Sequence, residues 1–266
     1  MRKYREEIEF ATSHLLNYNL FMKNYYQLIN ELRNLAEKCL VKHPEPRKEK
    51  EAILLYAIAK AEKTLSAIIL LCKNGMGEDA TILSRTLFEL SLTVEYILND
   101  KSNYQAERYM SYDWIQRINS YEYIKTSTSA EVLNKPENIR IIKDVDKHAQ
   151  EAQSKYKYNK FGWSDVSIHK MAEQFGKVGL YRTAYNIQCS LSHSNPRTMN
   201  DYFKIENDQL VLNSCSSDNL VEETLVITFS SYYELLAQFN EYFKKGVGEE
   251  LKKLEGEFVK KINLNK

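Results

Sequence analysis

Two short stretches of this sequence carry residues whose types and spacing could support chemistry. In the first, Arg85 and Glu89 are four residues apart within an apolar segment, so at helical spacing both lie on one face. A guanidinium and a carboxylate in such a segment must pair with each other or reach another polar group, because an unpaired buried charge is very costly. The stretch therefore predicts a paired or shared polar site.

The second stretch ends in a histidine. Ser190 and His193 are three residues apart, about one helical turn, and Tyr181 and Tyr185 flank the same stripe. An imidazole titrates near neutral pH and can act as a general acid or base, with Glu89 as its orienting partner. We expect the two stretches to face each other across a helix–helix interface. The predicted ligand-binding residues are Arg85, Glu89, Tyr181, Tyr185, Ser190 and His193, and the catalytic candidates are His193, Glu89 and Arg85.

Purely structural explanations of both stretches remain open. Arg85 and Glu89 also fit an intrahelical ion pair on a solvated face. A histidine near the C-terminus of a helix, as at His193, is favoured by the helix dipole alone. Ser190 and His193 on one helical turn are in addition a poor geometry for a nucleophile and its base.

The elements that must position these residues are predicted to be helices. Apolar residues recur at the helical period along most of the chain, and 8 Gly and 4 Pro are too few for a many-stranded sandwich or barrel. The exception is residues 202–212, where two short apolar runs flank Asn207 and Asp208. We predict an all-α multi-helix bundle with one small β-hairpin at residues 202–212.

No linker is long enough to require two domains, so we expect a single helical domain over residues 1–266. Its predicted parts are an N-terminal helix at 1–40, central helices at 47–126, a polar helix and the Ser-x-x-His helix at 136–195, the hairpin at 202–212 and C-terminal helices at 217–262.

Composition restricts the compartment. The four cysteines are far apart in the sequence, as is typical of reduced thiols, and glutamates occupy the N-terminal stretch where a signal peptide would need an apolar run. The most apolar stretch, residues 52–72, is interrupted by Lys60, Glu62 and Lys63. We therefore expect a cytoplasmic protein that does not enter a membrane.

Charge and surface pattern restrict the partners. The 37 Lys and Arg residues nearly balance the 36 Asp and Glu residues, so the net charge does not support a nucleic-acid partner, although a lysine-rich face near the C-terminus leaves one open. The aromatic segment 103–125 and the amphipathic C-terminal helices offer more apolar surface than one bundle needs. We expect a homo-oligomer or a protein partner.

The sequence lacks the motifs of several enzyme classes. Helical ribonucleases use an arginine and a histidine with four to six residues between them, and none of the five histidines has an arginine at that spacing. Glu-x-x-His, HExxH, P-loop and GxGxxG patterns are also absent from the sequence. We predict no metal and no cofactor.

Three segments together resemble an uncharacterised family of bacterial all-helical proteins: ILSRTLFELSLTVEYILND, WSDVSIHKMAEQFGKVGLY and YRTAYNIQCSLSHSNPRTMNDYF. That family's pattern is an Arg-x3-Glu helix, a Trp-Ser pair at the start of a short helix, and a Tyr-rich helix that ends in Ser-x-x-His. The corresponding residues here are Arg85 and Glu89, Trp163 and Ser164, and Tyr181, Tyr185, Ser190 and His193. The resemblance covers about residues 82–203 and implies the fold and the location of the site, not an activity.

Three functions remain open on this basis. The first is a ligand- or partner-binding protein, for which the resemblance suggests a setting in bacterial stress or phage defence. The second is a hydrolase acting on RNA, with His193 as general acid/base and Arg85 and Glu89 as its partners. The third is a helical scaffold without a small-molecule site.

Overall fold

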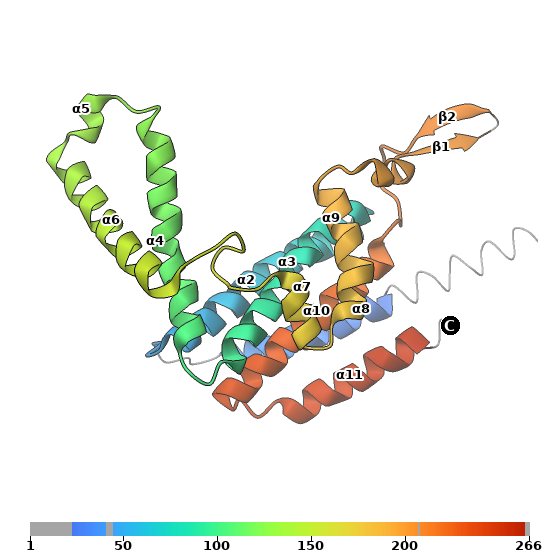
Figure 1. Cartoon of the computed structure of the whole chain (residues 1–266). Helices are drawn as coiled ribbons and strands as arrows, with labels where there is room; N and C mark the ends of the chain where they lie inside the picture. The colour runs from blue at the N-terminus through green and yellow to red at the C-terminus, as the bar shows by residue number, and fades with distance from the viewer. Residues whose placement is uncertain (1–22, 41–44, 207, 264–266) are drawn as a thin grey trace, which may run out of the picture. The chain divides into compact units, whose positions relative to one another are not determined.

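The computed structural model describes residues 23–40, 45–206 and 208–263 (Figure 1). This part of the chain is helical apart from its loops and one hairpin, so the predicted all-α fold with a small hairpin is confirmed. The predicted N-terminal helix at 1–40 is seen from residue 23 onward, and its earlier part lies outside the described residues.

Most of the long helices lie in the first and last parts of the described chain, and a group of short ones lies between them. Residues 23–40 are helical. The next helices are α2 (Glu49–Lys73), α3 (Gly77–Asn99), α4 (Tyr104–Lys125), α5 (Ala130–Leu133) and α6 (Pro136–Tyr156). They are followed by α7 (Ile168–Gln174), α8 (Val178–Leu180), the π-helical turn η1 (Tyr181–Tyr185), α9 (Asn186–Ser192) and the 3₁₀ turn η2 (Pro196–Asp201). The strands β1 (Phe203–Glu206) and β2 (Gln209–Leu212) precede the helices α10 (Val221–Phe243) and α11 (Gly248–Asn263).

The chain divides into two compact units. Among the described residues, unit 1 contains 23–40, 45, Leu54–Leu92, 177–206 and 208–263, and unit 2 contains Pro46–Ile53 and Thr93–Gly176. The helices α2 and α3 each contribute residues to both units. The single domain expected over residues 1–266 stays a prediction.

The core of unit 1 is built from the apolar faces of its long helices. Leu54, Ile58 and Leu65 of α2 are fully buried, and Phe229 of α10 stacks on Phe258 of α11 with ring centroids 4.0 Å apart. Each side chain of this size contributes roughly 1.5–3 kcal/mol to folding when it leaves water. This burial stabilises the packing of α2, α10 and α11.

A glycine allows α3 to begin against the start of α10. A Cβ atom at Gly77 would lie 1.9 Å from the carbonyl oxygen of Asn219 and 2.8 Å from the backbone nitrogen of Val221. Only glycine fits this close backbone approach. The side chain of Asn219 then donates a hydrogen bond of 3.0 Å to Glu78 in the first turn of α3.

Unit 2 has a core of its own, which is rich in aromatic residues. Ile53, Ile97 and Ala106 are buried, and Trp163 packs edge-on against Tyr109 with centroids 5.1 Å apart. The tryptophan of the Trp-Ser pair is therefore a packing residue. Ser164 does not cap a helix: its hydroxyl forms hydrogen bonds with the backbone of Val166.

The short helix after this pair begins four residues later. The N-cap of α7 is Ser167, whose side chain accepts a hydrogen bond of 3.2 Å from the Lys170 backbone N–H. A serine directly before the first helical residue is the better cap, because its oxygen reaches the free N–H groups of the first turn.

The hairpin is amphipathic. Its register pairs Phe203 with Leu212 and Ile205 with Leu210. Residues directly opposite in an antiparallel pair share one face of the sheet, so these four apolar residues form a single face. Ile205, Leu210 and Leu212 are 78%, 63% and 67% exposed.

Within the described ranges, none of the helices has the length and apolar character needed to cross a bilayer.

Candidate functional site

Arg85 and Glu89 form the predicted pair on α3. The guanidinium Nε donates to the Glu89 carboxylate over 2.8 Å, and the two side chains are 23% and 34% exposed. The pair is thus half-buried, between the solvated and the buried alternatives that the sequence left open.

Tyr185 completes a closed hydrogen-bonded triangle with this pair. Its hydroxyl donates to the same Glu89 oxygen over 2.8 Å, and the Arg85 Nη2 donates to that hydroxyl over 3.0 Å. The guanidinium carbon also lies 4.7 Å from the centre of the Tyr185 ring, within cation–π range. Tyr181 stacks on Tyr185 at 4.6 Å. We call Arg85, Glu89, Tyr181 and Tyr185 the polar cluster.

The pKa values of Tyr185, Arg85 and Tyr181 in the polar cluster are all raised. Burial raises the pKa of Tyr185 far above its ordinary value, and the hydrogen bond to Glu89 and the charge of that carboxylate raise it further. Burial by itself would lower the pKa of Arg85, but Glu89 raises it through a hydrogen bond and its negative charge. Burial also raises the pKa of Tyr181. Near neutral pH the cluster therefore contains a charged arginine and neutral tyrosines, which suits a structural or binding role better than proton transfer.

Ser190 and His193 lie outside these contacts. The Ser190 hydroxyl donates to the Asn186 carbonyl over 2.9 Å, and His193 is the exposed C-cap of α9. His193 follows Tyr185 by eight positions, a helical rise of roughly 12 Å, and Ser190 is rotated about the helix axis by about 140° from Tyr185. In the part of the chain that the structure describes, no hydrogen bond or ion pair joins either side chain to Arg85 or Glu89.

The structure thus brings together four of the six predicted site residues. A role in ligand binding or catalysis for any of the six stays a prediction. The helix that carries them also differs from the expected regular one, because Tyr181–Tyr185 form a π-helical turn. Such turns are rare and are found frequently at functional sites.

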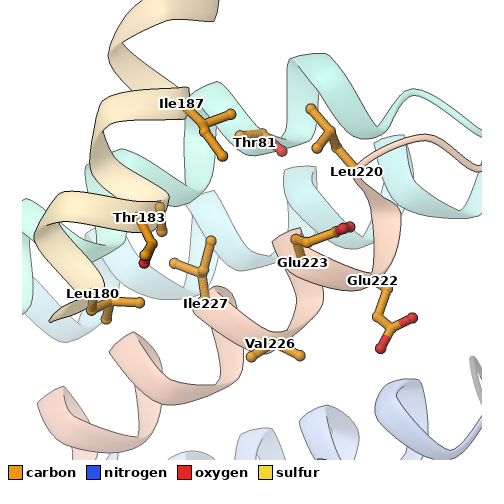
Figure 2. Close-up of a pocket in the computed structure, with 10 residues that line it drawn as sticks. Thr81, Leu180, Thr183, Ile187, Leu220, Glu222, Glu223, Val226 and Ile227 are labelled. Atoms are coloured by element: carbon orange, nitrogen blue, oxygen red, sulfur yellow. The ribbon is translucent and has the colours of Figure 1, made fainter. Parts of the chain in front are cut away.

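A pocket of about 380 Å³ lies beside this π-helical segment (Figure 2), and it is lined by Thr183 and Ala184 of the segment rather than by its two tyrosines. One wall comes from α8, η1 and α9, the opposite wall comes from α10, and Thr81 of α3 contributes a hydroxyl. All of these belong to unit 1. The lining residues are Thr81, Leu180, Thr183, Ala184, Ile187, Leu220, Glu222, Glu223, Val226 and Ile227.

The charged groups of the pocket are both acidic. Glu222 and Glu223 stand in the first turn of α10, and the described residues that line the pocket include no lysine or arginine. Burial raises the pKa of Glu222, and the negative charge of Glu223 adds to that rise. Leu220, directly before the helix, adopts a left-handed backbone with φ of 57°. This conformation is uncommon for a side chain of its size, and strain of this kind gathers at binding sites.

Buried polar bonds hold the pocket walls in place. Thr81 shares a hydrogen bond with Thr224 of α10, and the fully buried Gln188 of α9 donates to Ser84 of α3 over 2.8 Å. A hydrogen bond between two buried groups is costly to break, because each group would be left without a partner and without water to replace it.

Sequence reasoning did not single out the pocket residues. Thr81 and Ser84 did give a signal, since two hydroxyls at helical spacing in the apolar α3 have to find partners. The partners Thr224 and Gln188 are more than a hundred positions away. As for metals, no group of three or more His, Cys, Asp or Glu side chains is arranged to hold an ion within residues 23–40, 45–206 and 208–263.

The fold and the site define an all-helical protein with a polar cluster and a pocket at one π-helical segment. A family of unknown function (DUF5677) matches residues 51–210, well over half of the chain. The chain belongs to this family. The predicted membership of an uncharacterised helical family is therefore confirmed, and the matched range contains all six predicted site residues. No curated protein and no solved structure shows a significant match to the chain.

Proposed function

We propose that this protein binds a small organic ligand in the pocket between the α8–η1–α9 segment and α10. The observation that carries the proposal is the pocket itself: about 380 Å³, lined mainly by apolar side chains, with a few hydroxyls and carboxylates among them. Small-molecule sites in proteins have this size and this composition.

The polar cluster supports the pocket from behind. Tyr181 and Tyr185 lie on the same π-helical segment as Thr183 and Ala184, which line the pocket. By tying Tyr185 to Arg85 and Glu89, the cluster fixes the orientation of that segment on α3. A wall that is already in place costs the ligand less ordering entropy on binding.

Hydrolysis of RNA has less support from the geometry. His193 is exposed at the end of α9, and its intended partners Arg85 and Glu89 are engaged with Tyr185. A general base needs an orienting group within hydrogen-bond reach. A purely structural scaffold does not explain the pocket, its two carboxylates or the left-handed backbone of Leu220 beside it. It is therefore also the weaker alternative.

The proposal is tested by filling the pocket. Ala184→Trp places an indole in the cavity, whereas Ala130→Trp adds the same side chain at an exposed position of α5 in unit 2. Binding of 1-hexanol, a small amphipathic probe, is followed by ligand-observed NMR. We expect Ala184→Trp to abolish binding and Ala130→Trp to preserve it. If 1-hexanol binds none of the proteins, or binds both variants equally, the pocket is not the site.

Self-association is part of the proposal, with a second copy of this chain as the partner. The hairpin shows a face of four apolar residues, mostly exposed, and an isolated two-stranded hairpin is at best marginally stable in water. A two-fold related copy would cover this face with the same face. Four side chains give less area than the roughly 800 Å² per partner of a stable complex, so the association is expected to be weak and concentration-dependent.

A cytoplasmic location and a setting in bacterial stress or phage defence remain part of the same proposal. The proposed setting comes from the resemblance of the site segments to a bacterial helical family, and the proposed location comes from the wide spacing of the four cysteines.

A further inference from the structure

The walls of the pocket contain two kinds of surface. Leu180, Ile187, Leu220, Val226 and Ile227 supply aliphatic side chains from both sides. A ligand that fills the space between them must have an apolar body, since a polar one would lose its hydration without replacement.

The remaining polar groups of the lining accept hydrogen bonds or carry negative charge. The Thr183 hydroxyl already donates its proton to the Gly179 carbonyl over 2.9 Å, which leaves its oxygen as an acceptor. Thr81 shares its hydrogen bond with Thr224. Glu222 and Glu223 are the charged members of the lining.

Within the part of the chain that the structure describes, these two carboxylates have no compensating cation. Neither Glu222 nor Glu223 forms an ion pair or a hydrogen bond with any side chain in the described ranges. By contrast, Glu234 on the same helix is paired with Lys177 at 2.9 Å. Acidic residues in the first turn of a helix are stabilised slightly by the helix dipole. This stabilisation does not depend on a neighbouring pocket. Here the two negative charges stand at an apolar cavity, one of them partly buried.

We propose that the ligand is an organic cation, a primary or quaternary ammonium group joined to a compact aliphatic body. The inference rests on the proposed function and specifies its ligand class. The aliphatic body occupies the space between the α8–η1–α9 wall and α10, and the ammonium group lies against Glu222 and Glu223. An anion of the same shape is repelled by both carboxylates, and a neutral molecule gains only the apolar contact.

Three probes of equal chain length separate shape from charge: hexyltrimethylammonium, 1-hexanol and hexanoate. Their short chains keep them monomeric in solution, and binding to the full chain is measured by titration calorimetry at low and at high salt. We expect the cation to bind about tenfold more tightly than the alcohol at low salt. Hexanoate should bind most weakly, and the advantage of the cation should shrink as salt increases.

Isosteric variants assign the preference to the two carboxylates. Glu222→Gln and Glu223→Gln, singly and together, remove charge at exposed or half-exposed positions and keep the side-chain shape. We expect the double variant to bring hexyltrimethylammonium to within about twofold of 1-hexanol, with the affinity for 1-hexanol unchanged. Glu241→Gln is the matched control, because Glu241 is an exposed carboxylate on α10 outside the pocket.

The outcomes distinguish the two proposals. If 1-hexanol and the cation bind equally, and the glutamine variants change neither, the ligand class is wrong while the pocket remains a binding site. If Glu241→Gln lowers the preference as much as the pocket variants do, the effect is one of net charge and the ligand class is likewise wrong. If Ala184→Trp binds all three probes as well as the natural sequence, the proposed function itself fails.

Discussion

The hydroxyl of Tyr185 donates to the same Glu89 oxygen that accepts the Arg85 guanidinium, although the tyrosine follows Glu89 by 96 positions. One carboxylate oxygen thus ties the π-helical turn to α3. The contact is half-buried, where a charge-assisted hydrogen bond is stronger than at the surface and its loss is correspondingly more costly.

The first prediction concerns this shared carboxylate. We expect Glu89→Ala to lower the free energy of unfolding by about 1–3 kcal/mol, because it leaves Arg85 and the Tyr185 hydroxyl without their acceptor. Glu89→Gln should cost less, since an amide oxygen can still accept one of the two bonds. Denaturant titration followed by circular dichroism measures both values.

A matched control for Glu89 exists on α4. Asp113 and Arg117 have the same spacing and a 2.6 Å contact, but their side chains are more than half exposed. Asp113→Ala should therefore cost no more than about 0.5 kcal/mol. If the two alanine variants lose the same free energy, burial of the polar cluster contributes nothing.

The second prediction concerns Gly77. The Cβ atom added by Gly77→Ala would lie 1.9 Å from the carbonyl oxygen of Asn219, so the start of α10 must shift. We expect this shift to lower the free energy of unfolding by about 1–3 kcal/mol or more. Gly256→Ala is the control, because its added Cβ in α11 meets no atom within 4 Å. That variant should stabilise the protein by about 0.5–1 kcal/mol. In thermal unfolding, Gly77→Ala should lower the melting temperature and Gly256→Ala should raise it.

The third prediction concerns alkaline pH. Burial raises the pKa of Tyr25 and of Tyr233 from 10.0 to about 12. Since the unfolded chain loses these protons first, the stabilisation they provide is complete below pH 10 and is lost as the pH rises from 10 to about 12. Tyr233→Phe should flatten this part of the stability profile, measured by denaturation at fixed pH values. A profile with the same slope in both proteins would contradict the assignment.

The fourth prediction concerns the hairpin face. Ile205→Lys should weaken self-association at least about tenfold, because it places a charge at the centre of the covered surface. The free energy of unfolding of the monomer should change by less than about 0.5 kcal/mol, since Ile205 is 78% exposed. Light scattering across micromolar concentrations provides the test. A natural protein that stays at 31.2 kDa throughout would rule out the association.

The fifth prediction separates binding from hydrolysis. We expect His193→Ala to leave the affinity for hexyltrimethylammonium within about twofold of the natural value, because His193 caps α9 outside the pocket. We also expect no cleavage of labelled RNA by either protein. If the natural protein cleaves RNA and His193→Ala does not, the alternative function as a hydrolase is supported instead.

Local information in the sequence was enough to predict the helical fold, the hairpin and the Arg85–Glu89 pair. Helical periodicity depends on neighbours three and four residues apart, and the Arg85–Glu89 bond joins two residues at that spacing. The hairpin follows similarly from two short apolar runs around a turn. Tyr181 and Tyr185 could be placed at the site because they share a stripe on one helix.

Tertiary structure decided which polar groups meet. His193 and Ser190 were expected beside Glu89, but a rise of roughly 1.5 Å and a turn of about 100° per residue carry them away from Tyr185. The pocket was not predicted, because its walls come from segments brought together only by packing, through Thr81 with Thr224 and Gln188 with Ser84. No periodicity along one segment encodes such pairings. The Thr81–Thr224 bond, for example, joins α3 to α10, whose close approach at Gly77 exists only in the folded chain.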